Sequence, residues 1–380
     1  MKFLHLSDLH IGIRLHNYDL REEQRYIFQQ IITCVRKEQP DAVVIAGDIY
    51  DKSVPSAEAV ELFDSFMTQL RAAKKDMPIL LIGGNHDSPQ RIDCFRHILQ
   101  DERIYMVGIP PQKPEEYIQQ VTVSDEFGPV HFYLLPFVKP AFVRSVVGDD
   151  VTSYEEALHL LLERETVNRE ERNVLVSHQF FVKDREHAAE VERAETEVYT
   201  VGNIDSITSD CLKDFDYVAL GHIHKPMKVE RDTIRYCGTP MVYSLSEEGQ
   251  QKGMLLVTLA EKETKPVIQS IPLQPLRQVR SEEGTLAEVL ERPSDDYVWV
   301  CLTEKTDLDI SDMQMRLREA FPHLLGVRNK FTLTLAEEDI RLDQLQKSTP
   351  YDLFLQFCPD LDEEEKEIIK DVIHAVKGVV

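Results

Sequence analysis

The stretch Phe3-Leu4-His5-Leu6-Ser7-Asp8-Leu9-His10 decides the fold, because it joins an apolar run to two polar side chains that can bind a metal. The run Phe3–Leu6 predicts a buried β-strand, and Asp8 and His10 follow it directly. The same order of apolar run and polar motif recurs along the chain. Polar side chains at the carboxyl ends of such strands gather at one edge of an α/β sheet, where these proteins place their sites.

Four further motifs repeat this arrangement, and they are Gly47-Asp48-Ile49-Tyr50-Asp51, Gly84-Asn85-His86-Asp87, Ser177-His178 and Gly221-His222-Ile223-His224. Each motif alone is weak evidence, since a lone histidine is more often a surface or core residue than a ligand. Gly-His-x-His is more specific, because alternate strand positions point both imidazoles to one side. Together the five motifs contain five of the 13 histidines and predict one shared site.

The expected ligands of this site are carboxylate, imidazole and amide groups without a thiolate, namely Asp8, His10, Asp48, Asn85, His178, His222 and His224. Such a set suits a divalent ion such as Mn²⁺ or Fe²⁺. It is too large for one ion and predicts two ions, about 3.5–4 Å apart, that share a carboxylate. We expect His86, beside Asn85, to donate a proton to a leaving oxygen or to stabilise transition-state charge.

The alternation of apolar runs and amphipathic stretches predicts an α/β sandwich with mixed sheets over residues 1–265. The expected helices are Leu20–Val35 and Ala57–Leu70, and the expected strands are Phe3–Leu6, Ala42–Ala46, Ile79–Ile82, Phe132–Leu135, Val174–Val176, Tyr217–Leu220 and Met254–Leu259. The proline-spaced stretch from Lys265 to Pro275 predicts a linker.

Two smaller parts are expected beyond this stretch. Residues 276–340 predict a small α/β module with helices at Leu286–Leu290 and Met313–Phe321 and strands at Tyr297–Leu302 and Val327–Leu335. Residues 346–380 predict a helical C-terminal segment, because Thr349-Pro350 is typical of a helix start and apolar residues then recur at helical spacing.

The overall composition excludes several classes of protein. Lys and Arg number 43 and Asp and Glu 67, so the net charge of −24 argues against a free-standing nucleic-acid binder. Bound metal ions would add positive charge that this count omits. No apolar run approaches the ~20 residues of a membrane span. The six cysteines form no CxxC pair, which indicates neither a zinc site nor a disulfide framework and favours a reducing cytoplasm.

The ordered motifs resemble those of the calcineurin-like metallophosphoesterases. Within that superfamily, Met1–Gly12, Gly83–Pro89 and Gly221–Pro226 resemble the bacterial SbcD nuclease subunits. The resemblance implies a two-sheet metallophosphoesterase sandwich flanked by helices, a small α/β capping module for DNA recognition, and a helical tail that docks on an ATPase. The strong motifs lie between residues 1 and 245, and the module and tail match in layout more than in residues.

The resemblance also implies roles for single residues. Asp8, His10, Asp48 and His224 would hold one metal, and Asp48, Asn85, His178 and His222 would hold the other, with Asp48 bridging. His86 would be the catalytic histidine. The expected cofactors are two divalent ions, Mn²⁺ first, with Mg²⁺ or Fe²⁺ as alternatives. Asp51 departs from the pattern, because some relatives carry a histidine there.

The activity implied by the resemblance is that of a DNA-repair nuclease subunit with an SbcC-like SMC-type ATPase partner. A metal-bridging hydroxide would attack the phosphodiester in line, giving 3′→5′ exonuclease action on duplex ends and endonuclease action on hairpins. The resemblance further implies a homodimer through helices Leu20–Val35 and Ala57–Leu70, and a cytoplasmic, nucleoid-associated location. Candidate DNA contacts near the motifs are Arg14, His16, Arg91, Lys183 and Lys225, for which a solvated surface is an equal alternative.

The sequence leaves two alternative functions open. A small-molecule or cyclic-nucleotide phosphodiesterase would share the ligand set. A non-enzymatic scaffold protein is disfavoured, because all seven ligands and His86 are present. Protein phosphatases of the superfamily carry Arg-Gly after the second motif and Glu after Asn-His, whereas this chain has Lys52-Ser53 and Asp87, which argues against that activity.

Overall fold

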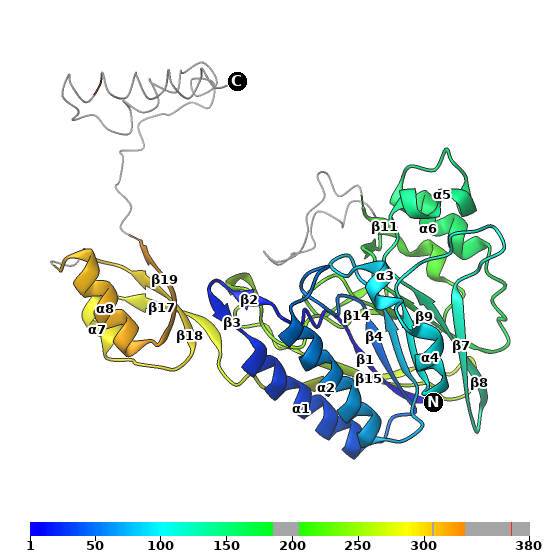
Figure 1. Ribbon diagram of the computed structural model, residues 1–380, viewed down its shortest axis with the longest axis horizontal. Coiled ribbons are helices and arrows are strands. Elements are labelled where there is room, and N and C mark those ends of the chain that lie inside the picture. The colour runs from blue at the N-terminus through cyan, green and yellow to red at the C-terminus, as the bar shows by residue number, and fades with distance from the viewer. Residues whose placement is uncertain (185–204, 306–307, 331–365, 367–380) are drawn as a thin grey trace.

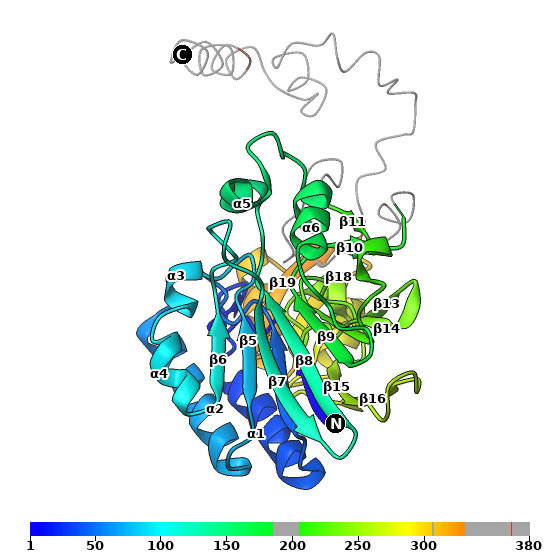
Figure 2. The same ribbon diagram turned by 90° about the vertical axis from the view of Figure 1, so that its right-hand side faces the viewer.

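The computed structural model describes residues 1–184, 205–305, 308–330 and 366. Within these ranges two six-stranded sheets pack face to face, and helices cover their outer faces (Figures 1 and 2). A core that includes Phe3, Val44, Phe132 and Tyr217 fills the space between the sheets, and the rings of Phe3 and Phe132 meet edge to face at 5.4 Å. This arrangement confirms the predicted two-sheet sandwich.

The first sheet has the order β16-β15-β1-β4-β5-β6. Four strands are parallel, namely β1 (Lys2–Leu6), β4 (Ala42–Ala46), β5 (Ile79–Ile82) and β6 (Ile104–Val107). The two others are added by antiparallel pairing, β15 (Gly253–Thr258) to β1 and β16 (Val267–Pro272) to β15. The sheet is therefore mixed, as the sequence predicts.

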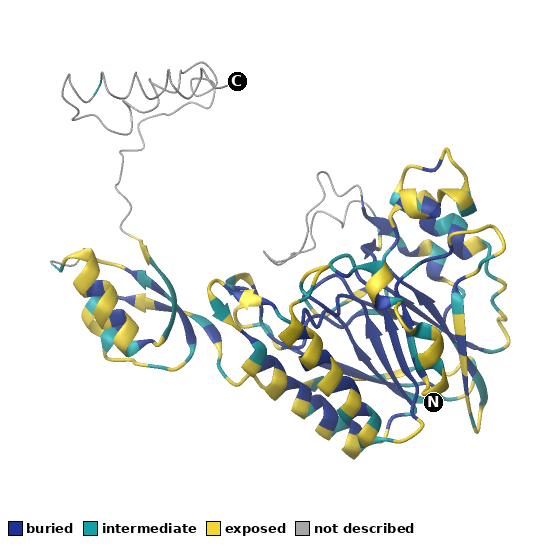
Figure 3. Cartoon of the chain, viewed as in Figure 1, coloured by how far each residue is buried: buried dark blue, intermediate teal, exposed yellow. Residues whose placement is uncertain are grey.

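Helices α1 (Arg21–Glu38) and α2 (Ala57–Ala73) lie on the outer face of this sheet (Figure 1). Their buried side chains recur at helical spacing and face the sheet, while the other side of each helix is exposed (Figure 3). Ser56 caps α2 by accepting a hydrogen bond from the Ala59 backbone N–H. The short helices α3 (Pro89–Ile92) and α4 (Arg96–Asp101) follow β5.

The second sheet has the order β13-β14-β12-β9-β8-β7. Its parallel centre is formed by β14 (Arg231–Tyr236), β12 (Tyr217–Leu220), β9 (Arg172–Ser177) and β8 (Gly128–Leu135). The outer strands β13 (Met227–Val229) and β7 (Gln119–Asp125) are antiparallel. Packed against it are α5 (Pro140–Val147), α6 (Tyr154–Glu163), the strand pair β10 (Phe181–Val182) and β11 (Ile207–Thr208), and the short helix η3 (Ser209–Leu212).

A small module follows, in which three parallel strands carry two helices (Figure 1). The strands are β17 (Val279–Gly284), β18 (Tyr297–Leu302) and β19 (His323–Asn329), and the helices are α7 (Leu286–Leu290) and α8 (Ile310–Ala320). The module contacts the hairpin of β2 (Arg14–Leu15) and β3 (Tyr18–Asp19), because the Tyr18 hydroxyl donates to the carbonyl oxygens of Pro322 and Leu324.

The predicted linker differs from the structure. Val267–Pro272 forms β16, which pairs along its whole length with β15. Prolines bound this strand at both ends, and an edge strand tolerates them because one side of its backbone needs no partner. The predicted helical segment 346–380 lies outside the described residues, apart from Lys366. Among the described helices, none is both long and apolar enough to cross a membrane.

Candidate metal centre

The five motifs of the sequence lie where strands of both sheets end. The first three follow β1, β4 and β5 of one sheet, and the last two follow β9 and β12 of the other. Because the two sheets pack face to face, side chains from these five ends meet in one place. The structure brings all seven predicted ligands together there.

One half of the cluster is built around two histidines. His10 Nε2 lies 3.2 Å from His224 Nε2 and 3.6 Å from Asp48 Oδ2. Asp8, His10 and His224 each offer a ligand atom within 4.8 Å of one another. This distance suits a single ion between them.

The other half is built around Asn85. Its Oδ1 lies 3.1 Å from His178 Nε2 and 2.9 Å from His222 Nδ1. His178 Nε2 also lies 3.2 Å from Asp48 Oδ2 and 3.9 Å from Asp8 Oδ1. Asp48 therefore contacts ligands of both halves, in the position that a bridging carboxylate would occupy.

The donor set fits a cation. His178 Nδ1 lies 2.7 Å from the Ala46 carbonyl oxygen, so an Nδ1–H donated there would leave Nε2 to bind a cation beside the Asp48 and Asn85 oxygens. Asp8 Oδ2 and His10 Nδ1 are buried and find no hydrogen-bond partner within the described residues. The unpartnered Asp8 oxygen, together with the His10 Nε2 and His224 Nε2 atoms that face each other at 3.2 Å, fits a site that holds a cation.

The pKa values of the clustered side chains also indicate a site for cations. Burial raises the pKa of Asp8 and lowers that of His10, so burial favours the neutral forms of both groups. Burial also opposes ionisation of Asp48, but the nearby His178 outweighs it and holds the Asp48 pKa well below its usual value. Against its own burial, His178 has its pKa raised to about 9 by Asp48 and Asp8. The carboxylates thus demand a cation, which bound metal ions would supply.

The loops that carry the ligands are strained. Asp8, His10, Asp48 and His222 all have positive φ angles, of 52°, 41°, 49° and 96°. Such conformations are rare for residues other than glycine and persist where surrounding structure enforces them, often at functional sites. Close packing adds a second constraint, since a Cβ on Gly84 would lie 2.1 Å from Asp48 Oδ1. The site therefore requires glycine at position 84.

His86 lies at the rim of the cluster. Its backbone N–H donates to Asp48 Oδ1 at 2.9 Å, and its Nδ1 lies 2.9 Å from the Asp51 carbonyl oxygen. The half-buried ring helps to line a pocket of about 490 Å³, formed by Asp51, Lys52, Ser53, Val54, Asn85 and His86. A substrate in this pocket would contact His86 and Asn85 together.

Three residues that support the cluster were given no structural role from the sequence. The Asp87 carboxylate accepts hydrogen bonds from the backbone N–H groups of Ile49, Tyr50 and Gly84, each at 2.9 Å. It therefore joins the loops after β4 and β5. Burial and the neighbouring Asp48 raise the Asp87 pKa to about 6.

Gln24 and Tyr243 hold the first loop in a similar way. The Gln24 side-chain amide donates to the carbonyl oxygens of Leu9 and His10, at 3.1 and 2.9 Å, and the Tyr243 hydroxyl donates to Leu9 at 2.6 Å. The available signal was a glutamine on the apolar face of a helix, where Gln24 is buried.

The predicted DNA-contact residues lie on separate elements around the cluster. Arg14 is exposed on the β2–β3 hairpin and donates to the Asn17 carbonyl oxygen. The His16 ring packs against Trp299 of the small module in a tilted arrangement, with ring centroids 5.4 Å apart, so it takes part in a contact within the chain. Three remain on the surface, Arg91 and Lys183 as exposed side chains and Lys225 as a half-buried one.

Comparison with known proteins identifies the family. A model of the calcineurin-like phosphoesterase family matches residues 1–226, and one of the type 5 capsule protein repressor C-terminal domain matches residues 272–360. The SbcD subunit of the SbcCD nuclease from Staphylococcus epidermidis is 30% identical over 339 residues, which are 87% of this chain and 85% of that protein. The chain belongs to the SbcD family of calcineurin-like phosphoesterases. The resemblance seen in the motifs is thereby confirmed.

A second relative agrees with the SbcD assignment. The protein of the same name from Staphylococcus saprophyticus is 29% identical over 365 residues, covering 93% of this chain and 92% of that protein. Among solved structures, a dimetal phosphatase from Danio rerio covers 72% of this chain and 96% of that chain, at 13% identity and a TM-score of 0.42. In this SbcD chain the second family match begins at residue 272, where β16 ends, and includes the small module.

Proposed function

We propose that this chain is the nuclease component of an SbcCD-type DNA-repair complex and that it hydrolyses DNA phosphodiesters with two divalent metal ions. The observation that carries the proposal is the convergence of seven ligand side chains from five strand ends beside His86. The two staphylococcal relatives, which carry the name of the SbcCD nuclease and match most of the chain, support it.

In this proposal Asp8, His10, Asp48 and His224 hold one ion, and Asp48, Asn85, His178 and His222 hold the other. Mn²⁺ is the expected metal, because oxygen and imidazole ligands without thiolate suit it. When bound, the two ions would act as Lewis acids and lower the pKa of bound water, so that this water could ionise near neutral pH. The chain's own contribution is to fix the ligands before metal arrives, as the bond from His178 to the Ala46 carbonyl does.

His86 acts on the substrate from the pocket side. With its Nδ1–H donating to the Asp51 carbonyl oxygen, the ring is held so that Nε2 is the atom left for substrate. A protonated Nε2 there would donate a hydrogen bond to the phosphate or a proton to the departing sugar oxygen. Asp51 enters this scheme through its backbone alone, so the side chain at position 51 need not be histidine.

Further parts of the proposal concern partners. We infer an SbcC-like SMC-type ATPase as partner, duplex ends and hairpins as substrates with 3′→5′ polarity on ends, and a homodimer as the assembly. The net charge of −24 supports a shared role of a partner in DNA binding, since the 67 acidic residues outnumber the 43 lysines and arginines that could contact phosphates. The segment 346–380, the proposed ATPase-docking tail, lies outside the described residues apart from Lys366.

The test is cleavage of an end-labelled linear duplex in Mn²⁺, Mg²⁺ or EDTA, with and without the ATPase partner and ATP. We expect Mn²⁺-dependent shortening that His86→Ala reduces by about 10²–10⁴-fold. His159→Ala, which removes a histidine from α6, is the matched control and keeps full activity. Rapid hydrolysis of cyclic nucleotides by a protein that leaves DNA intact under every condition would instead establish a small-molecule phosphodiesterase.

A further inference from the structure

A buried carboxylate faces the outer nitrogen of one proposed metal ligand. Glu247, the last residue of the short helix η4 (Leu245–Glu247), is fully buried, and its Oε1 lies 3.7 Å from His224 Nδ1. The other nitrogen of that ring, Nε2, lies 3.2 Å from His10 Nε2 inside the cluster. The imidazole of His224 therefore reaches from the metal centre to Glu247.

Glu247 is itself held in place from several sides. Lys252 Nζ lies 2.6 Å from Glu247 Oε2, and these two side chains are 3% and 0% exposed. The Thr239 hydroxyl donates to Oε2 at 3.2 Å, and the Ser244 hydroxyl donates to Oε1 at 3.0 Å. The carboxylate thus has one position, on the far side of His224 from the metal centre.

The same segment also fixes the backbone of His224. Its carbonyl oxygen accepts from Lys252 Nζ at 2.9 Å and from the Thr239 backbone N–H at 3.1 Å. The turn that allows this approach needs glycine, because Gly238 has φ +77° and a Cβ there would lie 2.6 Å from the His224 carbonyl oxygen. Ring and backbone of His224 are therefore both tied to residues 238–252.

Stability alone does not account for the Glu247–Lys252 pair. A buried ion pair is often no more stable than apolar side chains of similar volume, because both charges lose their hydration. A metal-binding histidine, however, usually donates its second ring N–H to a carboxylate or carbonyl, which fixes the tautomer and the ring orientation. Glu247 lies on the side of the ring from which it would accept that N–H from His224, at 3.7 Å, slightly beyond hydrogen-bond distance.

We propose that Glu247, locked by Lys252, is the positioning residue that turns His224 Nε2 toward the metal. This inference rests on the proposed two-metal site and adds to it a role for two residues outside the ligand set. The Nδ1–H of neutral His224 points to Glu247, and the charge of Lys252 balances the carboxylate, so the ring keeps its Nε2 lone pair for the ion.

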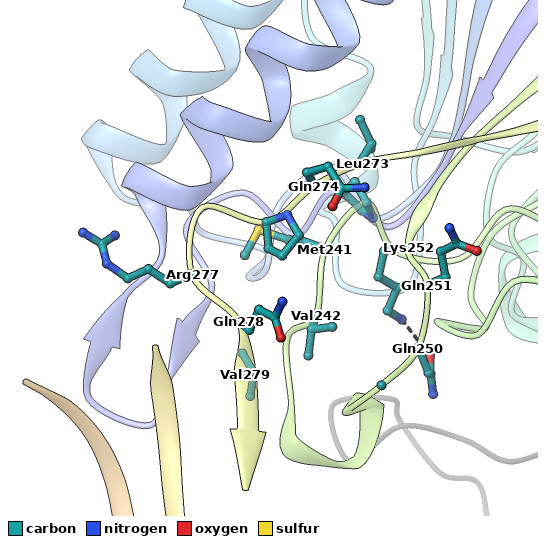
Figure 4. A pocket seen from close by; sticks show the side chains of 13 residues that line it. Met241, Val242, Gln250, Gln251, Lys252, Leu273, Gln274, Arg277, Gln278 and Val279 are labelled. Carbon is teal, nitrogen blue, oxygen red and sulfur yellow. Dashed lines mark hydrogen bonds between the residues drawn. The ribbon is translucent and has the colours of Figure 1, made fainter. Parts of the chain in front are cut away.

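The pair also lies near the small module. Lys252 borders a pocket of about 270 Å³ between residues 240–242, 249–252 and 273–279, where its Nζ bonds to Gln250 (Figure 4). The residue next to Glu247, Glu248, accepts hydrogen bonds from the backbone N–H and the hydroxyl of Ser281 in β17, both at 2.7 Å. Adjacent glutamates thus face the metal ligand and the module.

The experiment is a Mn²⁺ titration followed by electron paramagnetic resonance, which separates free ions, single bound ions and spin-coupled pairs. We expect Glu247→Gln to weaken one of the two ions by about 10–100-fold, so that the coupled-pair signal is lost while a single bound ion remains. The double variant Glu247→Gln/Lys252→Met removes both charges of the buried pair and is expected to show the same defect.

The control is Asp125→Asn, which breaks another buried ion pair, with Arg172, that makes no contact with the proposed ligands. We expect this variant to bind both ions like the wild type, although its Tm in EDTA falls by about as much as that of Glu247→Gln. Wild-type binding of both ions by Glu247→Gln, or by the double variant if the single one does not fold, would overturn the inference. A wild type that never forms the coupled pair would instead refute the two-metal site itself.

Discussion

Two buried ion pairs of the described residues, Arg172–Asp125 and Glu247–Lys252, stand in different places. Arg172 and Asp125 join the ends of β9 and β7, and the guanidinium also donates to the carbonyl oxygens of Leu259 and Ala260 beyond β15. This pair ties one sheet to the other, far along the strands from the ligand cluster. Glu247 and Lys252, by contrast, lie directly behind a proposed ligand.

The Arg172–Asp125 pair predicts a stability that depends on pH. Burial opposes ionisation of Asp125, but hydrogen bonds from Arg172 outweigh it and hold the Asp125 pKa below its usual 3.8. The pair therefore stabilises the fold above that pH and loses its effect as the pH falls further. We expect Asp125→Asn to lower the free energy of unfolding by about 3 kcal/mol at pH 7, because it leaves the Arg172 charge buried without its partner.

Urea unfolding at several pH values measures this effect. The difference between wild type and Asp125→Asn should shrink as the pH falls below 3.8. Asp214→Asn is the matched control, because its partner Arg169 is 68% exposed and such a pair contributes little. A difference for Asp125→Asn that stayed constant with pH would contradict the assignment.

Single residues differed in how far the sequence could predict them. The seven ligands and His86 stood out because each is a polar group that follows an apolar run. Asp87, Gln24 and Glu247 act by holding backbone groups or another side chain, and those partners are brought to them only by folding. A carboxylate that accepts from two N–H groups far away in the sequence, as Asp87 does from Ile49 and Tyr50, has no signature in the chain order.

At the scale of elements, buried strands were predictable and polar ones were not. Ala42–Ala46, Ile79–Ile82 and Tyr217–Leu220 have the bounds expected from their apolar runs. Strand β17 was missed because its sequence is charged; its Glu282 lies nearly buried only because Arg280 and Arg292 pair with it. Ion pairs across a small module replace the apolar signal there, and hydropathy cannot reveal them.

Two helices carry the surface that we propose for the homodimer. Val60 of α2 is 45% exposed, and Phe95 and Ile98, at the start of α4, are 70% and 67% exposed. Arg71 and Glu102 form an ion pair between the ends of these helices. The prediction from the sequence placed the dimer on the first two long helices; the exposed apolar groups favour the second of these together with α4.

Ile98→Asp tests this surface, because a charge there would be buried without a partner in the dimer. We expect sedimentation velocity to show a shift from dimer to monomer, with an unchanged far-UV circular dichroism spectrum. Ile310→Asp is the matched control, since Ile310 is 72% exposed on the small module, and it should remain dimeric. A wild-type chain that sediments as a monomer at micromolar concentration would contradict the proposed dimer.

At the scale of the whole molecule, the small module is held to the sandwich by both polar and apolar contacts. Arg277 donates to Glu22 at 3.0 Å and to Glu23 at 2.6 Å on α1, and the Tyr297 hydroxyl donates to the same Glu23 at 2.9 Å. Val279 and Tyr297 of the module are buried in the same apolar core as α1. The contact of Ser281 with Glu248 places part of this interface one residue from Glu247, behind the metal centre.

Arg277→Ala is predicted to loosen the module while leaving the sandwich folded. Trp299 is the single tryptophan of the chain and contacts His16 across the interface, so its fluorescence reports the contact. We expect a red-shifted Trp299 emission and faster proteolysis between β16 and β17, because the variant removes the ion pairs that Arg277 makes with Glu22 and Glu23. Arg292→Ala, which removes a pair within the module, is the control and should leave the emission unchanged. If Arg277→Ala also left the emission unchanged, the interface would hold without this arginine and the prediction would be wrong.

The same variant tests whether the module affects the metal centre. The segment of η4 contacts both the module, through Glu248, and His224, through Glu247. Weaker Mn²⁺ binding by Arg277→Ala would therefore show that the position of the module affects the metal centre.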